Sequence, residues 1–203
     1  ATQTVLEVAL SDPELDLHAR RAGAERVYET NRRNIESVDA LLSLAEIGAG
    51  TVRPAPADLA DVARDALDEV DGIAAARGIR VRRELHPAPL VGDGALVQRA
   101  VANLVVNAVL HNRDGGTIAV STSSARDGAA ELRIENSGPE LSPALVDSLT
   151  EPFVRGAGRV QSPNAPRGHG LGLAIVRSVA EAHGGELVLV PRRGRAAPSR
   201  PRP

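Results

Sequence analysis

The sequence predicts an α+β protein, with a helical hairpin first and a domain of mixed helices and strands after it. Over residues 1–50, apolar side chains recur at helical spacing. A Gly-Ala-Gly run and then a Pro-Ala-Pro stretch interrupt this pattern, and beyond them helical stripes alternate with strand-like segments. The predicted division is a hairpin over 1–50, a linker over 51–56, a mixed domain over 57–191 and a disordered tail over 192–203.

The composition limits both the core and the class of function. The chain has 203 residues, 42% of them apolar, but it contains one Phe, one Tyr, no Trp and no Met. A core must therefore be packed from Leu, Val, Ile and Ala. A formal charge of -2, with acids and bases mixed along the chain, argues against a nucleic-acid partner. The absence of Cys excludes disulfides, thiolate metal sites and a Cys nucleophile. The sequence also contains no apolar run of about 18 residues, the length that a membrane-spanning helix needs.

Residues 1–50 are expected to form two helices joined by a turn at Ser11-Asp12-Pro13, because a residue before proline disfavours the helical conformation. The second helix is expected to run to about Ile47. Three- and four-residue spacings give it a heptad seam with one polar position: Tyr28, Asn31, Ile35, Val38, Leu42 and Ala45. Such a seam packs on the chain's own domain or on a partner hairpin, and we favour the partner hairpin, hence a dimer.

The first half of the mixed domain predicts two helices and one strand. Asp58 can cap a helix that ends at Gly78. A strand follows over Ile79–Leu85, with a slip in its alternation, and Asp93 caps a second helix over 93–111. The apolar stripe of the first helix is expected to contain Leu59, Val62, Ala66, Val70 and Ile73.

In the second half of the mixed domain we expect two strands, then two helices, and then a final strand. Strands over Thr117–Ser123 and Ala130–Glu135 are joined by a hairpin turn at Asp127-Gly128. The remaining elements are expected to be a short helix over 143–149, a helix over 171–183 and a strand over Glu186–Val190.

The helix over 93–111 carries a polar row on an otherwise apolar surface. Arg99, Asn103, Asn107 and His111 recur every four residues, so they lie on one face. Buried amides need hydrogen-bond partners, which neighbouring backbone could supply. Alternatively, their carbonyl oxygens face a hydrated Mg²⁺ and phosphates, because Mg²⁺ prefers oxygen ligands.

A glycine-rich stretch, Arg167-Gly168-His169-Gly170-Leu171-Gly172-Leu173, leads into the helix over 171–183. Glycine lets backbone N–H groups approach an anion, and a helix N-terminus adds a positive partial charge. The dinucleotide-binding fingerprint does not apply, because Gln161–Pro166 is no strand. Spaced glycines before an amphipathic helix favour a phosphate-facing loop over an ordinary hinge.

Two weaker signals lie between these features. Asn136, at the end of a predicted strand, can both donate and accept hydrogen bonds and so pair with an adenine edge, although Asn-Ser-Gly-Pro is also simply a turn. Phe153, the only Phe, lies in a loop-rich segment and is interpreted as an anchor that pins this loop to the core. A lid over a nucleotide needs a hinge of this kind.

In their order along the chain, these four features resemble the N, G1, F and G2 boxes of the histidine-kinase ATPase superfamily, which also includes gyrase, Hsp90 and MutL-type ATPases. The resemblance covers residues 57–191, and residues 1–50 resemble most of a histidine kinase's dimerisation hairpin. It implies an α/β sandwich, in which helices cover one face of a mixed sheet and ATP lies between helix and lid. The Ala- and Arg-rich composition and the hairpin also resemble actinobacterial kinases, including those of the vancomycin-resistance sensor type.

Carried over by position, the resemblance makes Asn107 the Mg²⁺-binding residue. Asn103 lies one turn before it, and Arg155 would approach the phosphates, so that these three residues are the expected catalytic set. His111, Asn136 and Gly138 would also contact the nucleotide, and Phe153 would anchor the lid. The residues expected along the triphosphate are Gly168, His169, Gly170, Leu171 and Gly172.

Several positions depart from the family's pattern. Asn136 replaces the usual Asp at the adenine, Glu140 replaces a glycine, and Leu110 stands where many kinases have Lys or Arg. Hydrolytic members carry a Glu at the position of Asn103, and a neutral amide cannot act as a general base near pH 7. The site therefore suits transfer to a histidine. The alternatives are a nucleotide-binding regulatory module without kinase activity and a serine kinase of the anti-sigma-factor type.

The expected acceptor is a histidine in a His-Glu box that is followed by a Thr-Pro-Leu type stretch, and Ala1-Thr2-Gln3 resembles the sequence just downstream of that stretch. His18 does not match it, since Ala-Arg-Arg follows. We expect the acceptor to lie outside the chain, and the chain to be a cytoplasmic fragment, inactive alone, of a protein anchored in the plasma membrane. Expected partners are ATP, a second copy through the hairpin and a response regulator.

Overall fold

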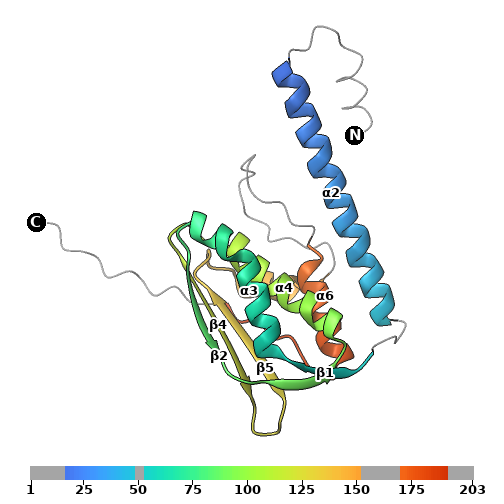
Figure 1. Ribbon diagram of the computed structural model, residues 1–203, viewed down its shortest axis with the longest axis vertical. Helices are drawn as coiled ribbons and strands as arrows, with labels where there is room; N and C mark the ends of the chain where they lie inside the picture. The colour runs from blue at the N-terminus through green and yellow to red at the C-terminus, as the bar shows by residue number, and fades with distance from the viewer. Residues whose placement is uncertain (1–16, 49–52, 152–169, 192–203) are drawn as a thin grey trace, which may run out of the picture. The chain divides into compact units, whose positions relative to one another are not determined.

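The computed structural model describes residues 17–48, 53–151 and 170–191, and the chain divides into two units, Ala1–Ala45 and Glu46–Pro203. Helix α2 (Leu17–Gly48) accounts for the described part of the first unit (Figure 1). The predicted turn at Ser11-Asp12-Pro13 and the predicted tail lie outside the described residues. Each of the six predicted seam residues on α2 is exposed, including Tyr28 at 72% and Leu42 at 56%.

The second unit contains two layers, a sheet and the helices that cover one of its faces (Figure 1). The sheet has the order β2-β4-β5, in which β2 (Arg80–Leu85) runs parallel to β4 (Thr117–Ser124) and β5 (Ala130–Asn136) runs antiparallel to it. Helices α3 (Leu59–Ala76) and α4 (Gly94–Leu110) pack on this sheet. The mixed sheet with helices on one face, predicted from the sequence, is confirmed.

Three further elements complete the second unit. Strands β1 (Ala55–Asp58) and β3 (Pro89–Gly92) form a separate antiparallel ribbon. Helix α6 (Gly172–Ala182) packs against α4, and a short helix, α5 (Pro143–Ser148), follows the sheet. Among the described residues, no helix has the length and apolar character that a membrane crossing requires.

The helices begin where the sequence predicts caps. The carboxylate of Asp58 accepts a hydrogen bond from Ala60 N at 2.8 Å and one from Ala88 N at 3.0 Å, so it caps α3 and also holds the segment before β3. Gly78 closes the same helix with φ +62°, a conformation that favours glycine. The turn between β4 and β5 also forms as predicted, with Gly128 at φ +87° and Asp127 accepting from Ala129 N.

Small aliphatic residues fill the space between sheet and helices. The largest fully buried side chains are Leu67 on α3, Val105 and Val109 on α4, and Ile118, Val120 and Thr122 on β4. Alanines such as Ala63 and Ala108 lie between them and allow close approach of the helices. The prediction of a core without aromatic side chains is confirmed for the described residues.

Arg83 explains the irregular alternation of β2, which we predicted to be a slip. The strand has no slip: Arg83 pairs with Val120, whose side chain is buried on the covered face, and so takes the central position of that face between Val81 and Leu85. Its guanidinium bonds Asp68 at 2.5 Å and Asp71 at 2.6 Å on α3. These hydrogen bonds raise the pKa of Arg83, and the bond to Asp68 has the largest effect.

Three other expectations are wrong in detail. Ile73 is 54% exposed, and Leu67 and Ala74 occupy the buried face of α3 instead. Ala55 and Pro56, expected in a linker, belong to β1. Glu186–Val190 forms no strand.

In this last segment Val188 is 65% exposed and Val190 is 78% exposed, while Leu187 and Leu189 are half-buried. A run of residues that favour strands is therefore not enough to make a strand here. Within the part of the chain that the structure describes, no backbone hydrogen bond joins this segment to the sheet.

We predict that Gly92→Ala lowers the melting temperature. A Cβ at this buried position would lie 2.4 Å from His183 Cδ2 and 2.7 Å from its Nε2, so the ring would have to move. Overpacking of this kind costs about 1–3 kcal/mol. Thermal unfolding followed by far-ultraviolet circular dichroism measures the effect.

Gly94→Ala is the matched control, because nothing lies within 4 Å of a Cβ built there. It should leave the melting temperature unchanged or raise it slightly. Equal melting temperatures for the two variants would contradict the packing of His183 on Gly92.

Candidate functional site

The polar row on α4 faces α6. A Cβ built on Gly172, the first residue of α6, would lie 3.3 Å from Asn103 Oδ1 and 3.4 Å from Asn107 Nδ2. Both asparagines are half-buried. The absence of a side chain at Gly172 thus lets the start of α6 approach two amides that the sequence predicted to lie on one face.

Within the part of the chain that the structure describes, no side chain caps the N-terminus of α6. Its capping residue, Leu171, is buried at 2% and offers no side-chain hydrogen bond to the first N–H groups. Gly170 adopts φ +70°, which turns the chain into the helix. The structure therefore brings Gly172, which follows Gly170 and Leu171 in the chain, next to the two amides, and the binding of a triphosphate by these residues stays a prediction.

At the other end of the row, the end of β5 meets the C-terminus of α4. Asn136 Nδ2 donates a long hydrogen bond of 3.5 Å to the carbonyl oxygen of His111. A Cβ on Gly138 would lie 2.2 Å from this same oxygen and 2.8 Å from Asn136 Nδ2. The predicted site residues His111, Asn136 and Gly138 are thus neighbours, and only a glycine fits at position 138.

Sequence reasoning missed Asn112, which holds this corner. Asn112 is 6% exposed, and with Thr122 it is one of two buried polar side chains in the described ranges. Its Nδ2 donates to Thr117 O at 3.1 Å, and its Oδ1 accepts from Ser137 Oγ at 3.0 Å. The only signal for it was an asparagine directly after a buried helix.

A second missed residue, Arg77, stabilises the C-terminus of α4. Its guanidinium donates to Val109 O at 2.5 Å and to Asn112 O at 2.9 Å, and it pairs with Asp114 at 2.8 Å. A cation is favourable at this end of a helix, where unpaired carbonyl groups carry a negative partial charge.

The N-terminus of α4 is held to the C-terminal end of α6. Asp93 N donates to His183 Nε2 at 2.9 Å, while His183 Nδ1 lies 2.7 Å from Val179 O. The Asp93 carboxylate caps α4 through Ala95 N and Leu96 N. Its hydrogen bond from Arg53 N, more than those from α4, lowers the pKa of Asp93.

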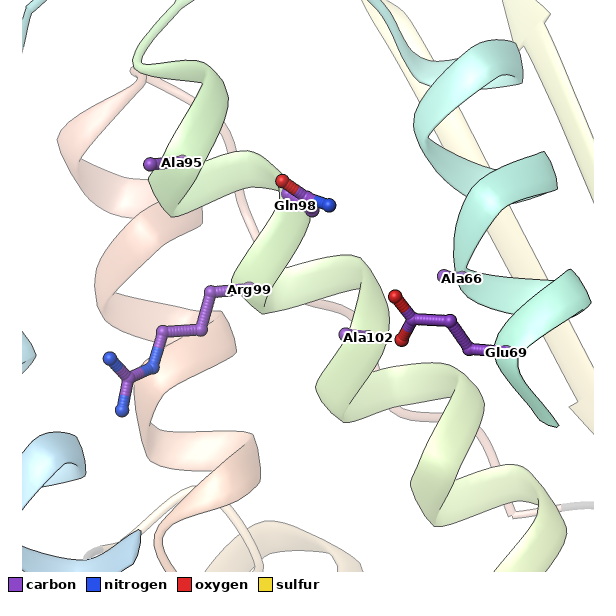
Figure 2. Close-up of a pocket in the computed structure, with 6 residues that line it drawn as sticks. All are labelled: Ala66, Glu69, Ala95, Gln98, Arg99 and Ala102. Atoms are coloured by element: carbon purple, nitrogen blue, oxygen red, sulfur yellow. The ribbon is translucent and has the colours of Figure 1, made fainter.

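Four predicted site residues lie outside the described residues: Phe153, Arg155, Gly168 and His169. Arg99, the first residue of the polar row on α4, lies within the described residues. Arg99 extends from α4 across the side on which α6 lies, as Figure 2 shows.

Two shallow hollows lie away from the amide pair. One, of about 210 Å³ between α3 and α4, is bounded by small side chains and by Glu69, Gln98 and Arg99 (Figure 2). The other, of about 250 Å³, lies on the uncovered face of the sheet around Ala119 and Ser121. Neither hollow includes Asn103, Asn107 or the start of α6.

The arrangement can bind an anion and a cation side by side. The N–H groups at the start of a helix such as α6 favour phosphate, and the amide oxygens of Asn103 and Asn107 are ligands of the kind that Mg²⁺ prefers. The two side chains nearest Gly172, those of Asn103 and Asn107, are neutral amides, and a neutral amide cannot act as a general base near pH 7.

Comparison with known proteins places this geometry in a family. The profile described as "Histidine kinase-, DNA gyrase B-, and HSP90-like ATPase" matches residues 92–200, which include α4, β4, β5, α5 and α6. Sensor protein CutS of Streptomyces coelicolor is 40% identical over 193 residues, covering 95% of this chain and 46% of CutS. Sensor histidine kinase TrcS of Mycobacterium tuberculosis is 32% identical over 169 residues, covering 80% of this chain and 32% of TrcS. The chain thus spans less than half the length of these relatives.

Solved structures have the same fold. The mycobacterial sensor histidine kinase MprB is 31% identical, with a TM-score of 0.55 over 65% of this chain and 81% of that chain. Full-length ShkA in complex with AMPPNP is 22% identical, with a TM-score of 0.67 over 89% of this chain and 37% of that chain, and at this identity the likeness concerns the fold alone.

We predict that Asp93→Asn reduces the loss of stability in acid. The folded state lowers the pKa of Asp93, so its carboxylate stabilises the fold fully above the unfolded value of about 3.9. This contribution is lost as pH falls through the lower folded value. Urea unfolding at about pH 7 and about pH 3 measures the difference, and an identical pH dependence in both proteins would refute the role of this carboxylate.

We predict that Gly138→Ala lowers the free energy of unfolding by about 1–3 kcal/mol, because a Cβ cannot coexist with the His111 carbonyl oxygen at its present place. Gly72→Ala, in the exposed interior of α3 with nothing within 4 Å of its Cβ, should instead stabilise by about 0.5–1 kcal/mol. Urea unfolding of both variants checks this, and a neutral Gly138→Ala would show that β5 and α4 are less close than described.

Proposed function

The chain belongs to the histidine kinase-, DNA gyrase B- and HSP90-like ATPase family, and from this premise we propose that it is the part of a sensor histidine kinase that holds ATP for transfer of its terminal phosphoryl group to a histidine. The observation that carries the proposal is the pair of amides, Asn103 and Asn107, lying against the glycine that begins α6. The relatives CutS and TrcS are named as sensor proteins, and ShkA, which has the same fold, was solved with AMPPNP.

The residues present fit a metal-bound triphosphate in their chemistry. Because Gly172 has no side chain, the backbone at the start of α6 comes close to Asn103 and Asn107. The first N–H groups of α6 have no side-chain cap, so they can donate to phosphate oxygens. Asn107 would contribute its amide oxygen to Mg²⁺, and Asn103 would orient the neighbouring groups. When bound, ATP with Mg²⁺ supplies the phosphoryl group and the charge neutralisation that its transfer requires.

The described residues of the site position a substrate and do not activate water. Hydrolysis would call for a base near the metal, and the residue one turn before Asn107 is Asn103, whose amide is neutral near pH 7. Phosphoryl transfer depends mainly on position and electrostatic stabilisation, which the α6 N-terminus and the amides can provide. We therefore propose an incoming imidazole, rather than water, as the nucleophile.

The acceptor and the partners follow from the same proposal. The nucleophile would be a histidine of the longer protein, and the exposed seam of α2 supports a second copy as the partner of that helix. Tyr28, Ile35, Val38 and Leu42 are each more than half exposed on it, and such a stripe suits helix–helix packing. A response regulator would then receive the phosphoryl group on an aspartate.

Two positions, Leu110 and Glu140, favour a second function, which is nucleotide binding without phosphoryl transfer. Leu110 is half-buried and Glu140 is exposed where the resemblance leads us to expect a cation and a glycine, respectively. A protein that binds the nucleotide but does not transfer its phosphoryl group would tolerate both. Titration with ATP, followed by a test for acid-labile phosphate in the protein with its acceptor segment, separates binding alone from binding with transfer.

We predict that Asn107→Ala weakens Mg²⁺-dependent ATP binding by about ten- to a hundredfold, because it removes an oxygen ligand from a charged centre. Isothermal titration calorimetry with and without Mg²⁺ measures the change. The variant should lose the difference between the two conditions as well as affinity.

Gln98→Ala is the matched control. Gln98 is another amide of α4, but it is exposed and lines the hollow between α3 and α4 instead of facing α6. It should bind ATP as the unaltered chain does. Unchanged Mg²⁺-dependent binding by Asn107→Ala would remove Asn107 from the metal site, and no binding of any adenine nucleotide by the unaltered chain would refute the proposed function.

A further inference from the structure

A closed set of hydrogen bonds lies directly beside Asn136. Thr117 N donates to Ser137 Oγ at 2.8 Å, and Ser137 N donates to Thr117 O at 3.0 Å. Asn112 Oδ1, which also accepts from Arg113 N at 3.0 Å, is an amide oxygen and can only accept, so the Ser137 hydroxyl donates its proton to it at 3.0 Å. Asn112 Nδ2 in turn donates to Thr117 O at 3.1 Å. The direction of each bond is thereby determined, and the ends of α4, β4 and β5 are joined.

This set fixes the backbone from which the Asn136 side chain projects. Asn136 shares the covered face of the sheet with Ile134, and it pairs with Ile118 at the start of β4. Asn112 follows His111, whose carbonyl oxygen accepts from Asn136 Nδ2. The two consecutive pairs, His111–Asn112 and Asn136–Ser137, therefore bond to one another across the corner between helix and sheet.

The carbonyl oxygen of His111 also determines which atom of the Asn136 amide is available. That oxygen lies at the C-terminal end of α4, where the helix dipole is negative. It attracts the NH₂ group of Asn136 and would repel a carboxylate. With Nδ2 turned to His111, the Asn136 Oδ1 is left as an acceptor of hydrogen bonds.

We propose that Asn112 and Ser137 are positioning residues that hold the Asn136 amide with its oxygen toward the base, so that the site accepts a purine with an exocyclic amino group and disfavours one with a carbonyl group there. This inference rests on the proposed function, since it concerns the base of the same nucleotide. Adenine places a donor where guanine places an acceptor, and the Asn136 oxygen can bond only the donor. Neither Asn112 nor Ser137 needs to touch the nucleotide.

The test compares three probes, each with Mg²⁺, on the full chain: ATP, GTP and inorganic tripolyphosphate. Tripolyphosphate has no base and reports on the phosphate site alone. Ser137→Ala removes one acceptor and one donor from the set, and we expect the ratio of ATP to GTP affinity to fall by about tenfold. Tripolyphosphate affinity should stay unchanged, and Ser137→Thr, which keeps the hydroxyl, should keep the preference for ATP.

A double-variant comparison shows whether Ser137 acts through Asn136. Asn136→Leu should abolish the preference for ATP, and adding Ser137→Ala to it should cause no further change in the ratio. Ser123→Ala, at an exposed position of β4, is the matched serine control and should behave as the unaltered chain. Asn112→Ala, which leaves a buried bond unmade, is a supporting variant only, because it risks unfolding the protein.

The outcomes separate this inference from the proposed function. If the unaltered chain binds none of the three probes, the proposed function fails, and this inference fails with it. If it binds ATP and GTP equally, or if Ser137→Ala keeps the full preference, only the inference is overturned. A parallel loss of ATP and tripolyphosphate in Ser137→Ala would also overturn it, since the role would then be general to the fold.

Discussion

The hydrogen bonds of one buried amide, that of Asn112, determine where the candidate site lies. A buried amide must find partners for its donor and acceptor, or it costs about 1–3 kcal/mol. Asn112 finds them on the first residue of β4 and the residue after β5, and so it ties the end of α4 to the sheet. At the other end of α4, Asp93 N bonds His183 and so ties this helix to α6. With both ends held, α4 presents its polar row to α6 in a defined place.

The apolar remainder of α4 gives this polar row its meaning. The opposite side of the helix is buried against the sheet and α3 through Val97, Val101, Val105 and Val109. The helix therefore cannot turn its amides away from α6 without exposing these valines to solvent. Asn103 and Asn107 are consequently presented to the start of α6, where a glycine lets the two helices approach closely. The packing of apolar side chains in the core thereby orients Asn103 and Asn107, the groups that would hold a nucleotide.

Patterns within one element predicted their structures well, whereas pairings between distant elements could not be predicted. The period of α4, its cap at Asp93 and the turn at Asp127-Gly128 depend on neighbours in sequence, and the structure confirms them. The ribbon of β1 with β3 joins two proline-containing segments that no local pattern marks as strands. Arg83 looked like an error in alternation because its carboxylate partners lie on α3. The interatomic contacts of Phe153, Arg155, Gly168 and His169 stay predictions.

The placement of the single tyrosine has an optical consequence. Tyr28 is the only strong near-ultraviolet chromophore of the chain, since Trp is absent, and it stands exposed on α2 in the first unit. Tyrosine emission therefore reports on that helix and on whatever covers its seam. The domain that would hold the nucleotide is almost dark by comparison, so a nucleotide carrying a fluorescent base could be followed there against very little background from the protein.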